Sequence, residues 1–538
     1  MTVTDTEAPS AVTSDAPALA PPRPAPGFAA LIGTGDHRKL GRLWIGTSFL
    51  FLLASFVYGA LIGLEEIDTS GIDVVEVDSV AQIFSVHAVA GVFLFLIPAI
   101  IGLAMSIVPR QVGSPTVAFP RAAAAAYWTY LIGGAVVLTS VLADGGPGGG
   151  DADAVALFLA AMLMVLASLT LAAVSIATTG LALRTEGMRL NRAPLFTWST
   201  IVAAGIWVVT LPILAGIVLL AYVDVKYGST FIGGGPQLYL RMSWAWNQPT
   251  VYMYAIPALG IVADIVPVAA RTRITQHRVA MGAIGAFALF SFGAWALPGF
   301  NPSTSGDLAL AYTDEVPFVA WSFLVLLPLL ALAGLLADTI RRGDVKVISP
   351  MVWGAAALVM LLAGAANGAL VSVDPLDLVN TTGVTSQINY VLVAAALAVL
   401  GGLVYWAPLI WGGRFPEGPS MALAGGGLLG TILYCLPDLI SGFLGQRALL
   451  GGATDDVDTI EVLNIVSFVG FVILGLVALG FVGLLLRVGR TTDDGDDPSA
   501  PDTADPWDGH TLEWAGDDQP AVTSEAPVYD ARHAEVSS

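Results

Sequence analysis

A few polar side chains stand inside long apolar stretches of this sequence, where a membrane would leave them without water. His87 is the one histidine of five in such a stretch, and Cys435 is the single cysteine. Asp438 is either a deep carboxylate or a residue near the outer interface that water reaches. One cysteine forms no disulfide or cysteine-based metal cluster within its own chain. Polar groups at this depth either hydrogen-bond between helices or mark the path of a solute.

The elements that hold these residues are long apolar segments. The chain has 538 residues, of which 56% are hydrophobic and only 12% charged, against roughly 25% charged in soluble domains. About 20 residues at 1.5 Å each cross the roughly 30 Å hydrocarbon layer. We therefore expect an all-α integral membrane protein, a twelve-helix transmembrane bundle. Its expected spans are 43–63, 84–108, 122–143, 153–182, 195–223, 240–269, 279–298, 315–338, 350–371, 388–412, 419–443 and 461–486.

The basic residues predict the orientation of the spans. Seventeen of the 22 Lys and Arg residues lie just before the first span, just after the last or in the even-numbered connections, and Arg23 and Arg532 lie in the tails. Only Lys226, Arg241 and Arg447 fall on the opposite side. Because basic residues gather on the cytoplasmic side, this multi-pass protein should have both termini in the cytoplasm.

The chain ends differ in composition from the membrane domain. Residues 1–36 are rich in Pro, Ala and Thr without an apolar core, so we expect a disordered cytoplasmic tail and no signal peptide. Residues 37–490 form the membrane domain, and residues 491–538 read as an acidic, disordered cytoplasmic tail. The net charge of −20 comes without a basic stripe, which disfavours nucleic acid and leaves membrane lipid as the surrounding partner.

Five short strings occur in the order and spacing of one known family. They read GDHRKLG, VAFPR, GMRLNRAPLFTW, WAWNQPTVY and TLEW, at Gly35–Gly41, Val117–Arg121, Gly187–Trp198, Trp244–Tyr252 and Thr511–Trp514. Together they resemble the heme-copper oxidase subunit I family, of the cytochrome c oxidase subunit I type. The resemblance implies a prokaryotic plasma membrane, a respiratory chain and partner subunits of the subunit II and III kinds.

The resemblance also implies chemistry that this sequence is poorly equipped to perform. Family members reduce dioxygen at a high-spin heme beside copper, fed by a low-spin heme, and the three centres need six membrane histidines. Only His87 matches one of them, as a low-spin heme ligand; its alternative role is an interhelical hydrogen bond. The other five ligand positions fall on Gln248, Leu297, Pro298, Gln387 and Asn389.

Other functional positions of the family are changed as well. Thr116 and Thr250 stand where the resemblance implies carboxylates of a proton path. Tyr252 matches a tyrosine tied covalently to a copper ligand, and Gln248 cannot form that link. The family's arginine pair for the heme propionates falls near Ala448 and Leu449. The sequence thus indicates a pseudoenzyme with no catalytic residues and no metal ligands.

Three functions remain open. The first is a cofactor-free structural or assembly partner of a respiratory complex. The second is a heme-binding oxidoreductase of respiratory electron transport, which keeps one heme through His87 and a second ligand such as Met105. The third is a conduit for a small solute or ion through a polar cavity, with Asp438 on its path. We expect the residues at that cavity to hydrogen-bond one another, namely Asn247, Gln248, Thr250, Tyr252, Gln387 and Asn389.

Overall fold

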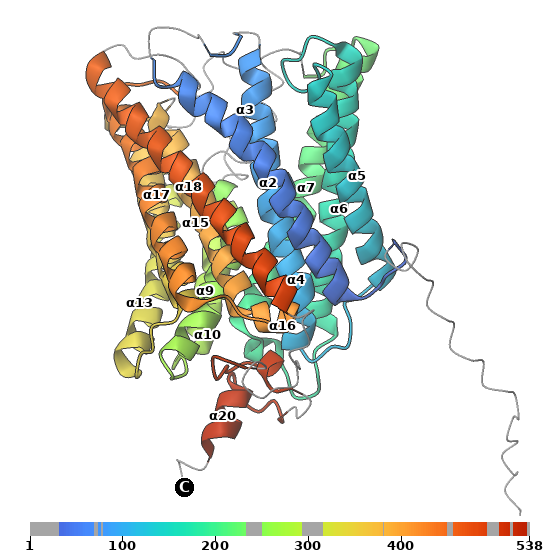
Figure 1. Cartoon of the computed structure of the whole chain (residues 1–538), viewed down its shortest axis with the longest axis vertical. Helices are drawn as coiled ribbons and strands as arrows, with labels where there is room; N and C mark the ends of the chain where they lie inside the picture. The colour runs from blue at the N-terminus through green and yellow to red at the C-terminus, as the bar shows by residue number, and fades with distance from the viewer. Residues whose placement is uncertain are drawn as a thin grey trace, which may run out of the picture.

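The computed structural model is a bundle of long helices (Figure 1). It describes residues 32–68, 74–76, 79–232, 250–292, 316–379, 381–448, 456–491, 505–516 and 520–534. The helices up to the middle of the chain are α2 (His37–Glu65), α3 (Val80–Val89), η2 (Ala90–Leu96), α4 (Ile97–Gln111), α5 (Pro120–Leu142), α6 (Ala152–Ala182), η3 (Leu190–Arg192), α7 (Leu195–Tyr227), η5 (Thr250–Tyr254), α9 (Ile256–Ala269) and α10 (His277–Phe292). Those that follow are α12 (Val316–Leu324), α13 (Leu326–Arg342), α14 (Ser349–Val371), η7 (Asp374–Leu376), α15 (Thr382–Tyr405), α16 (Ala407–Trp411), α17 (Glu417–Phe443), α18 (Val457–Thr491), η8 (Leu512–Trp514) and α20 (Pro527–His533).

The expected all-α membrane bundle is confirmed. Within the described ranges, ten helical segments are long and apolar enough to cross a membrane. The expected sixth and seventh spans are described only in part, as the 14-residue α9 and the 16-residue α10. The number twelve therefore stays a prediction.

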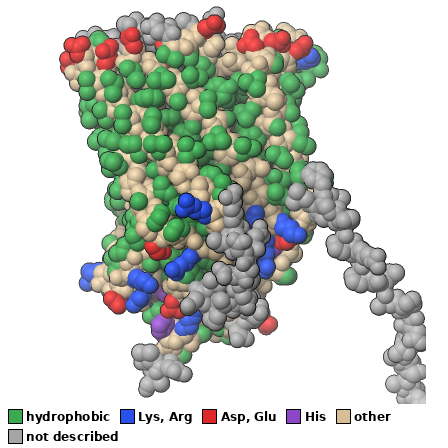
Figure 2. All heavy atoms as spheres, in the orientation of Figure 1, with side chains coloured by type: hydrophobic (Ala, Val, Ile, Leu, Met, Phe, Trp, Pro, Cys, Tyr) green, Lys and Arg blue, Asp and Glu red, His purple; other side chains and the backbone are tan. Residues whose placement is uncertain are grey.

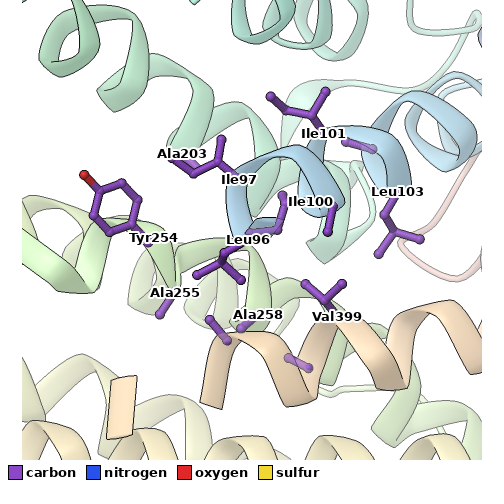
Figure 3. Packing of buried hydrophobic residues seen from close by; sticks show 14 of the residues in the cluster. Leu96, Ile97, Ile100, Ile101, Leu103, Ala203, Tyr254, Ala255, Ala258 and Val399 are labelled. Carbon is purple, nitrogen blue, oxygen red and sulfur yellow. The ribbon is translucent and has the colours of Figure 1, made fainter. Parts of the chain in front are cut away.

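Helices that follow one another in the chain pack side by side, as α5 with α6, α6 with α7, α14 with α15 and α17 with α18. The second span runs through α3, η2 and α4 and is the most deeply buried. Figure 3 shows Ile97 and Ile100 of α4 facing Ala203 of α7 and Ala258 of α9, with Val399 of α15 close by. This close-packed centre fixes the positions from which the polar side chains project.

Local sequence explains where several helices begin and end. The carboxylate of Asp36 accepts the backbone N–H of Arg38 at 2.9 Å and caps α2. Asp151 does the same for α6, accepting from Asp153 and Ala154. Such caps satisfy the free N–H groups of the first helical turn.

In the second span, η2 is a π-helical segment of 7 residues directly after α3.

The two ends of the bundle carry opposite charge. Figure 2 shows acidic side chains along the upper edge and most Lys and Arg side chains at the lower end. We call the lower end, with Arg110 and Arg271, the basic end, and the other, with Glu66 and Asp144, the acidic end. This separation agrees with the positive-inside pattern of the sequence. The placement of the basic end in the cytoplasm remains a prediction.

Two stretches of the C-terminal region differ from the expected disordered tail. Residues 505–516 and 520–534 pack beneath the basic end and include η8 and α20 (Figure 1). Leu512 and Trp514 are buried, and Glu513 is only 7% exposed. The indole N–H of Trp507 donates to the carbonyl of Tyr405 at 2.9 Å. The expectation of disorder was wrong for these residues, because a few apolar anchors hold a segment whose average composition is polar.

Candidate functional site

His87 lies on α3 and hydrogen-bonds to the neighbouring α2. Its Nδ1 is 2.8 Å from the carbonyl oxygen of Ser55, so Nδ1 donates. The hydroxyl of Ser55 in turn donates to the carbonyl of His87 at 3.1 Å. The ring also sits against Gly59, where an added Cβ would come within 2.8 Å of it. The interhelical hydrogen bond that the sequence suggested is therefore present.

Met105 and His87 cannot both bind the iron of one heme. The two residues stand on the same continuous span, 18 residues apart, which corresponds to about 27 Å along a helix. Met105 is fully buried, and its carbonyl lies 2.9 Å from Nδ1 of His37, close to the start of α2. The suggestion of Met105 as a second heme ligand was wrong.

Gln387 and Asn389 project from α15 in different directions, as residues two apart on a helix must. Gln387 is fully buried beside the hydroxyl of Tyr252, and among the described residues neither its Oε1 nor its Nε2 has a partner with hydrogen-bond geometry. Asn389 is partly buried and lies against Tyr434 of α17. Asn247 and Gln248 lie outside the described residues, so the expected hydrogen bonds between the amides stay a prediction.

Tyr252 and Asn367 complete the polar surroundings of Gln387. The fully buried hydroxyl of Tyr252 is 3.5 Å from the carbonyl of Gly364 on α14. Asn367, also on α14, donates to the hydroxyl of Ser386 at 2.9 Å, while its Oδ1 has no partner. Asn367 was not predicted, although an amide within an expected apolar span is itself a signal.

Asp438 is buried near the acidic end of α17, with an exposed fraction of 6%. Its carboxyl lies next to Ser467 of α18 and close enough to Glu66 for their charges to interact. Glu66 follows the last residue of α2. Burial of Asp438 agrees with a deep carboxylate, and its position one or two turns from the helix end agrees with a residue near the outer interface.

Several predicted positions cannot be placed. Asn247, Gln248, Leu297 and Pro298 lie outside the described residues. Thr250 begins η5. The predicted polar cavity is therefore described only on the side of Tyr252 and α15.

A second polar network lies near the basic end and was not predicted. Nε2 of Gln111, at the end of α4, is 2.9 Å from both Oδ2 of Asp264 and Oε1 of Glu513. Glu513 also accepts the indole N–H of Trp406 at 3.0 Å. Burial raises the pKa of the Glu513 carboxyl. This network ties the C-terminal segment to the helices α4 and α9 and to the end of α15.

Asp264 gives this network a structural role within the bundle. Its two carboxylate oxygens accept the backbone N–H groups of Leu195 and Phe196 at 3.0 and 3.1 Å. These are the first residues of α7, so Asp264 caps that helix from the neighbouring α9. Asp264 thus caps α7 and, through Gln111, is linked to Glu513 of the docked C-terminal segment.

The arrangement of these helices and buried positions defines a multi-pass, all-helical membrane protein. The sequence matches the family model described as "Cytochrome C and Quinol oxidase polypeptide I" over residues 39–473. On this match, the chain belongs to the heme-copper oxidase subunit I family.

Individual relatives agree with this assignment. A Streptomyces coelicolor protein described as "Putative cytochrome c oxidase subunit 1-beta" is 30% identical over 409 residues, or 71% of this chain and 69% of that protein. Quinol oxidase subunit 1 of Bacillus subtilis is 25% identical over 415 residues, or 72% of this chain and 62% of that protein. The solved structure of a heme-copper terminal oxidase dimer has the same fold, with a TM-score of 0.65, 14% identity and 84% coverage of both chains.

The family's cofactors can be tested against the donor atoms present. Because Nδ1 of His87 donates to Ser55, the tautomer leaves Nε2 as the nitrogen that could bind a heme iron. Gln387 and Asn389 offer only amides, which are poor ligands for iron and copper. Among the described residues, His87 could hold a heme iron, whereas the side chains of Gln387 and Asn389 do not suit iron or copper.

Proposed function

We propose that this protein keeps the subunit I scaffold in a prokaryotic plasma membrane without the oxygen-reducing heme and copper centre. In this proposal it is a structural or assembly partner of a respiratory complex, in contact with subunits of the II and III kinds. The observation that carries the proposal is the histidine count. The chain has five histidines, and only His87 lies at a membrane ligand position.

The chemistry at the replaced positions supports this proposal. Gln387 is fully buried, and both polar atoms of its side chain lack partners. Buried polar atoms of this kind are unfavourable, and an amide binds iron weakly. A position under selection for heme ligation would hold an imidazole instead.

The orientation of the protein is part of the same proposal. We place the basic end in the cytoplasm, together with both termini and the docked stretches of residues 505–516 and 520–534. The gathering of Lys and Arg side chains at that end supports this placement (Figure 2). Cysteine labelling of an exposed residue at each end, Arg414→Cys and Asp144→Cys, tests it in intact cells. A membrane-impermeant reagent should modify only the second variant, and the reverse pattern would reject the orientation.

The test of the main proposal is the absorption spectrum and metal content of the purified protein. An oxidase subunit I with all six ligands, expressed in the same host, serves as the control for cofactor supply. We expect the control to load heme and copper, and this protein to contain no copper and no oxygen-reducing heme. Stoichiometric copper and heme, together with oxygen uptake, would overturn the proposal.

A second candidate function is a one-heme protein that moves electrons without reducing oxygen. The observation in its favour is the hydrogen bond from Nδ1 of His87 to Ser55, which leaves Nε2 for iron. Bound heme would supply a one-electron centre, and His87 would hold and orient it. A pyridine hemochrome assay of the wild type and of His87→Ala decides between the two functions. Heme that is lost in the variant supports the candidate, and absence of heme from both proteins rejects it.

A further inference from the structure

A cavity of about 340 Å³ lies at the basic end between the C-terminal segment and two loops of the membrane domain. One wall is formed by the end of α9 and Arg271, and another by Lys346 and Ile348, which precede α14. The C-terminal segment forms the rest, including His510 and Tyr529. The volume is in the range of small-molecule sites. The cavity exists only while the C-terminal segment is docked.

His510 lines this cavity and carries a polar atom without a partner among the described residues. The side chain is 5% exposed, and its buried Nδ1 has no hydrogen-bond partner. The ring is held edge-on against Tyr529, with ring centres 4.5 Å apart, and Tyr529 packs against His533 at 4.3 Å. A ligand that hydrogen-bonds to Nδ1 would remove an unfavourable unpaired group.

The two acidic residues in the cavity wall are already engaged within the C-terminal segment. Arg532 forms ion pairs of 2.7 Å with both Asp505 and Asp508. Asp505 also accepts the backbone N–H of Gly509 at 3.0 Å. These carboxylates therefore hold the segment together, and one guanidinium compensates one of their two negative charges.

The cations in the cavity wall are less engaged. Lys346 is exposed, and its ammonium has no ion pair among the residues that the structure describes. Arg271 has only Asp344 at 3.6 Å, and that carboxylate is itself 91% exposed. Exposed pairs of this kind are weak and exchange readily with other anions. Figure 2 shows Lys and Arg side chains at the lower end of the molecule, with some Asp and Glu side chains among them.

We propose that this cavity binds a small phosphate-bearing anion. Lys346 and Arg271 supply charge from two loops, and Nδ1 of His510 supplies a hydrogen bond from the C-terminal segment. A phosphate offers acceptor oxygens in several directions at once, which matches donors on separate walls. Because the ligand contacts both the loops and the C-terminal segment, binding stabilises the docked arrangement.

The test uses the full-length protein in phosphatidylcholine nanodiscs and inorganic pyrophosphate as the probe. Titration calorimetry of the wild type should show saturable binding, and Lys346→Gln and Arg271→Gln should each weaken it about tenfold or more. Lys39→Gln is the matched control, since Lys39 is an exposed lysine on α2 outside the cavity. It should bind pyrophosphate like the wild type.

His510→Phe gives an independent check, because it keeps a ring against Tyr529 and removes the nitrogen. We expect weaker pyrophosphate binding with unchanged thermal unfolding of the unliganded protein. Absence of saturable binding to the wild type up to about 10 mM would overturn the proposal. Equal weakening in Lys346→Gln and Lys39→Gln would also overturn it, because it would indicate unspecific attraction.

The phosphate could belong to a soluble anion or to a lipid headgroup, and nanodiscs with added phosphatidylglycerol distinguish these sources. If the lipid occupies the cavity, pyrophosphate binding becomes weaker as its fraction rises, and Lys346→Gln removes that competition. If the source is soluble, the pyrophosphate affinity stays the same in both lipid compositions.

Discussion

The carboxyl of Glu513 should decide whether the segment of residues 505–516 stays docked on the basic end. Its Oε1 accepts N–H groups from Gln111 and Trp406 at 2.9 and 3.0 Å. In Glu513→Ala, Gln111 still donates to Asp264, whereas the buried indole N–H of Trp406 loses its acceptor. One buried donor left unpaired costs about 1–3 kcal/mol. Taking about 2 kcal/mol, the undocked population should rise roughly 30-fold.

Hydrogen exchange of the full-length protein in nanodiscs measures this population. Amides of Leu512–Trp514 should exchange roughly 30-fold faster in Glu513→Ala, while amides in the middle of α4 keep their protection. Glu513→Gln is the matched control, because its amide oxygen still accepts both N–H groups and no charge is buried. Unchanged exchange in Glu513→Ala would refute the assigned role of these hydrogen bonds. Equal loss of protection in both variants would show that the negative charge, and not the acceptor, holds the segment.

Three further predictions concern pH, packing and the replaced ligand position. Burial raises the pKa of Glu513 above its ordinary value of 4.5, so the docked form binds the proton more tightly than the undocked form. Docking should therefore weaken as the pH rises from 4.5 through the pKa of the docked form. Glu513→Gln should remove this pH dependence of the exchange rates. Gly59→Ala places a methyl group 2.8 Å from the His87 ring and should lower stability by about 1–3 kcal/mol in thermal unfolding. Gly46→Ala on the same helix meets nothing within 4 Å and should stabilise by about 0.5–1 kcal/mol. Gln387→Leu should stabilise the protein by about 1 kcal/mol, because it removes two unpaired polar atoms; a loss of stability would instead indicate that Gln387 binds a group in the cell.

The spans were predictable because the thickness of a bilayer dictates their length and composition. The fourth span was expected at 153–182 and is found at Ala152–Ala182, and the eleventh was expected at 419–443 and is found at Glu417–Phe443. The start of the fourth span coincides with a local signal, the capping Asp151. The replaced ligand positions rest on residue identity in register with a family, and they stay a prediction.

Contacts between distant segments were not predictable in the same way. The C-terminal stretch looked disordered because its average composition is polar, and Leu512 and Trp514 are too few to form a periodic pattern. Gln111 and Asp264 were not among the predicted functional residues. Their significance comes from Glu513, and no spacing within the sequence indicates that pairing.

The bond between Gln111 and Glu513 joins residues 402 positions apart. Ribosomal synthesis supplies Gln111 early and Glu513 only after every span of the membrane domain has been made. The contact of the C-terminal segment with α4 and the end of α15 therefore forms as a last step. A nascent or prematurely terminated chain would present the bare indole donor of Trp406 there, which a chaperone or a protease could distinguish from the finished protein.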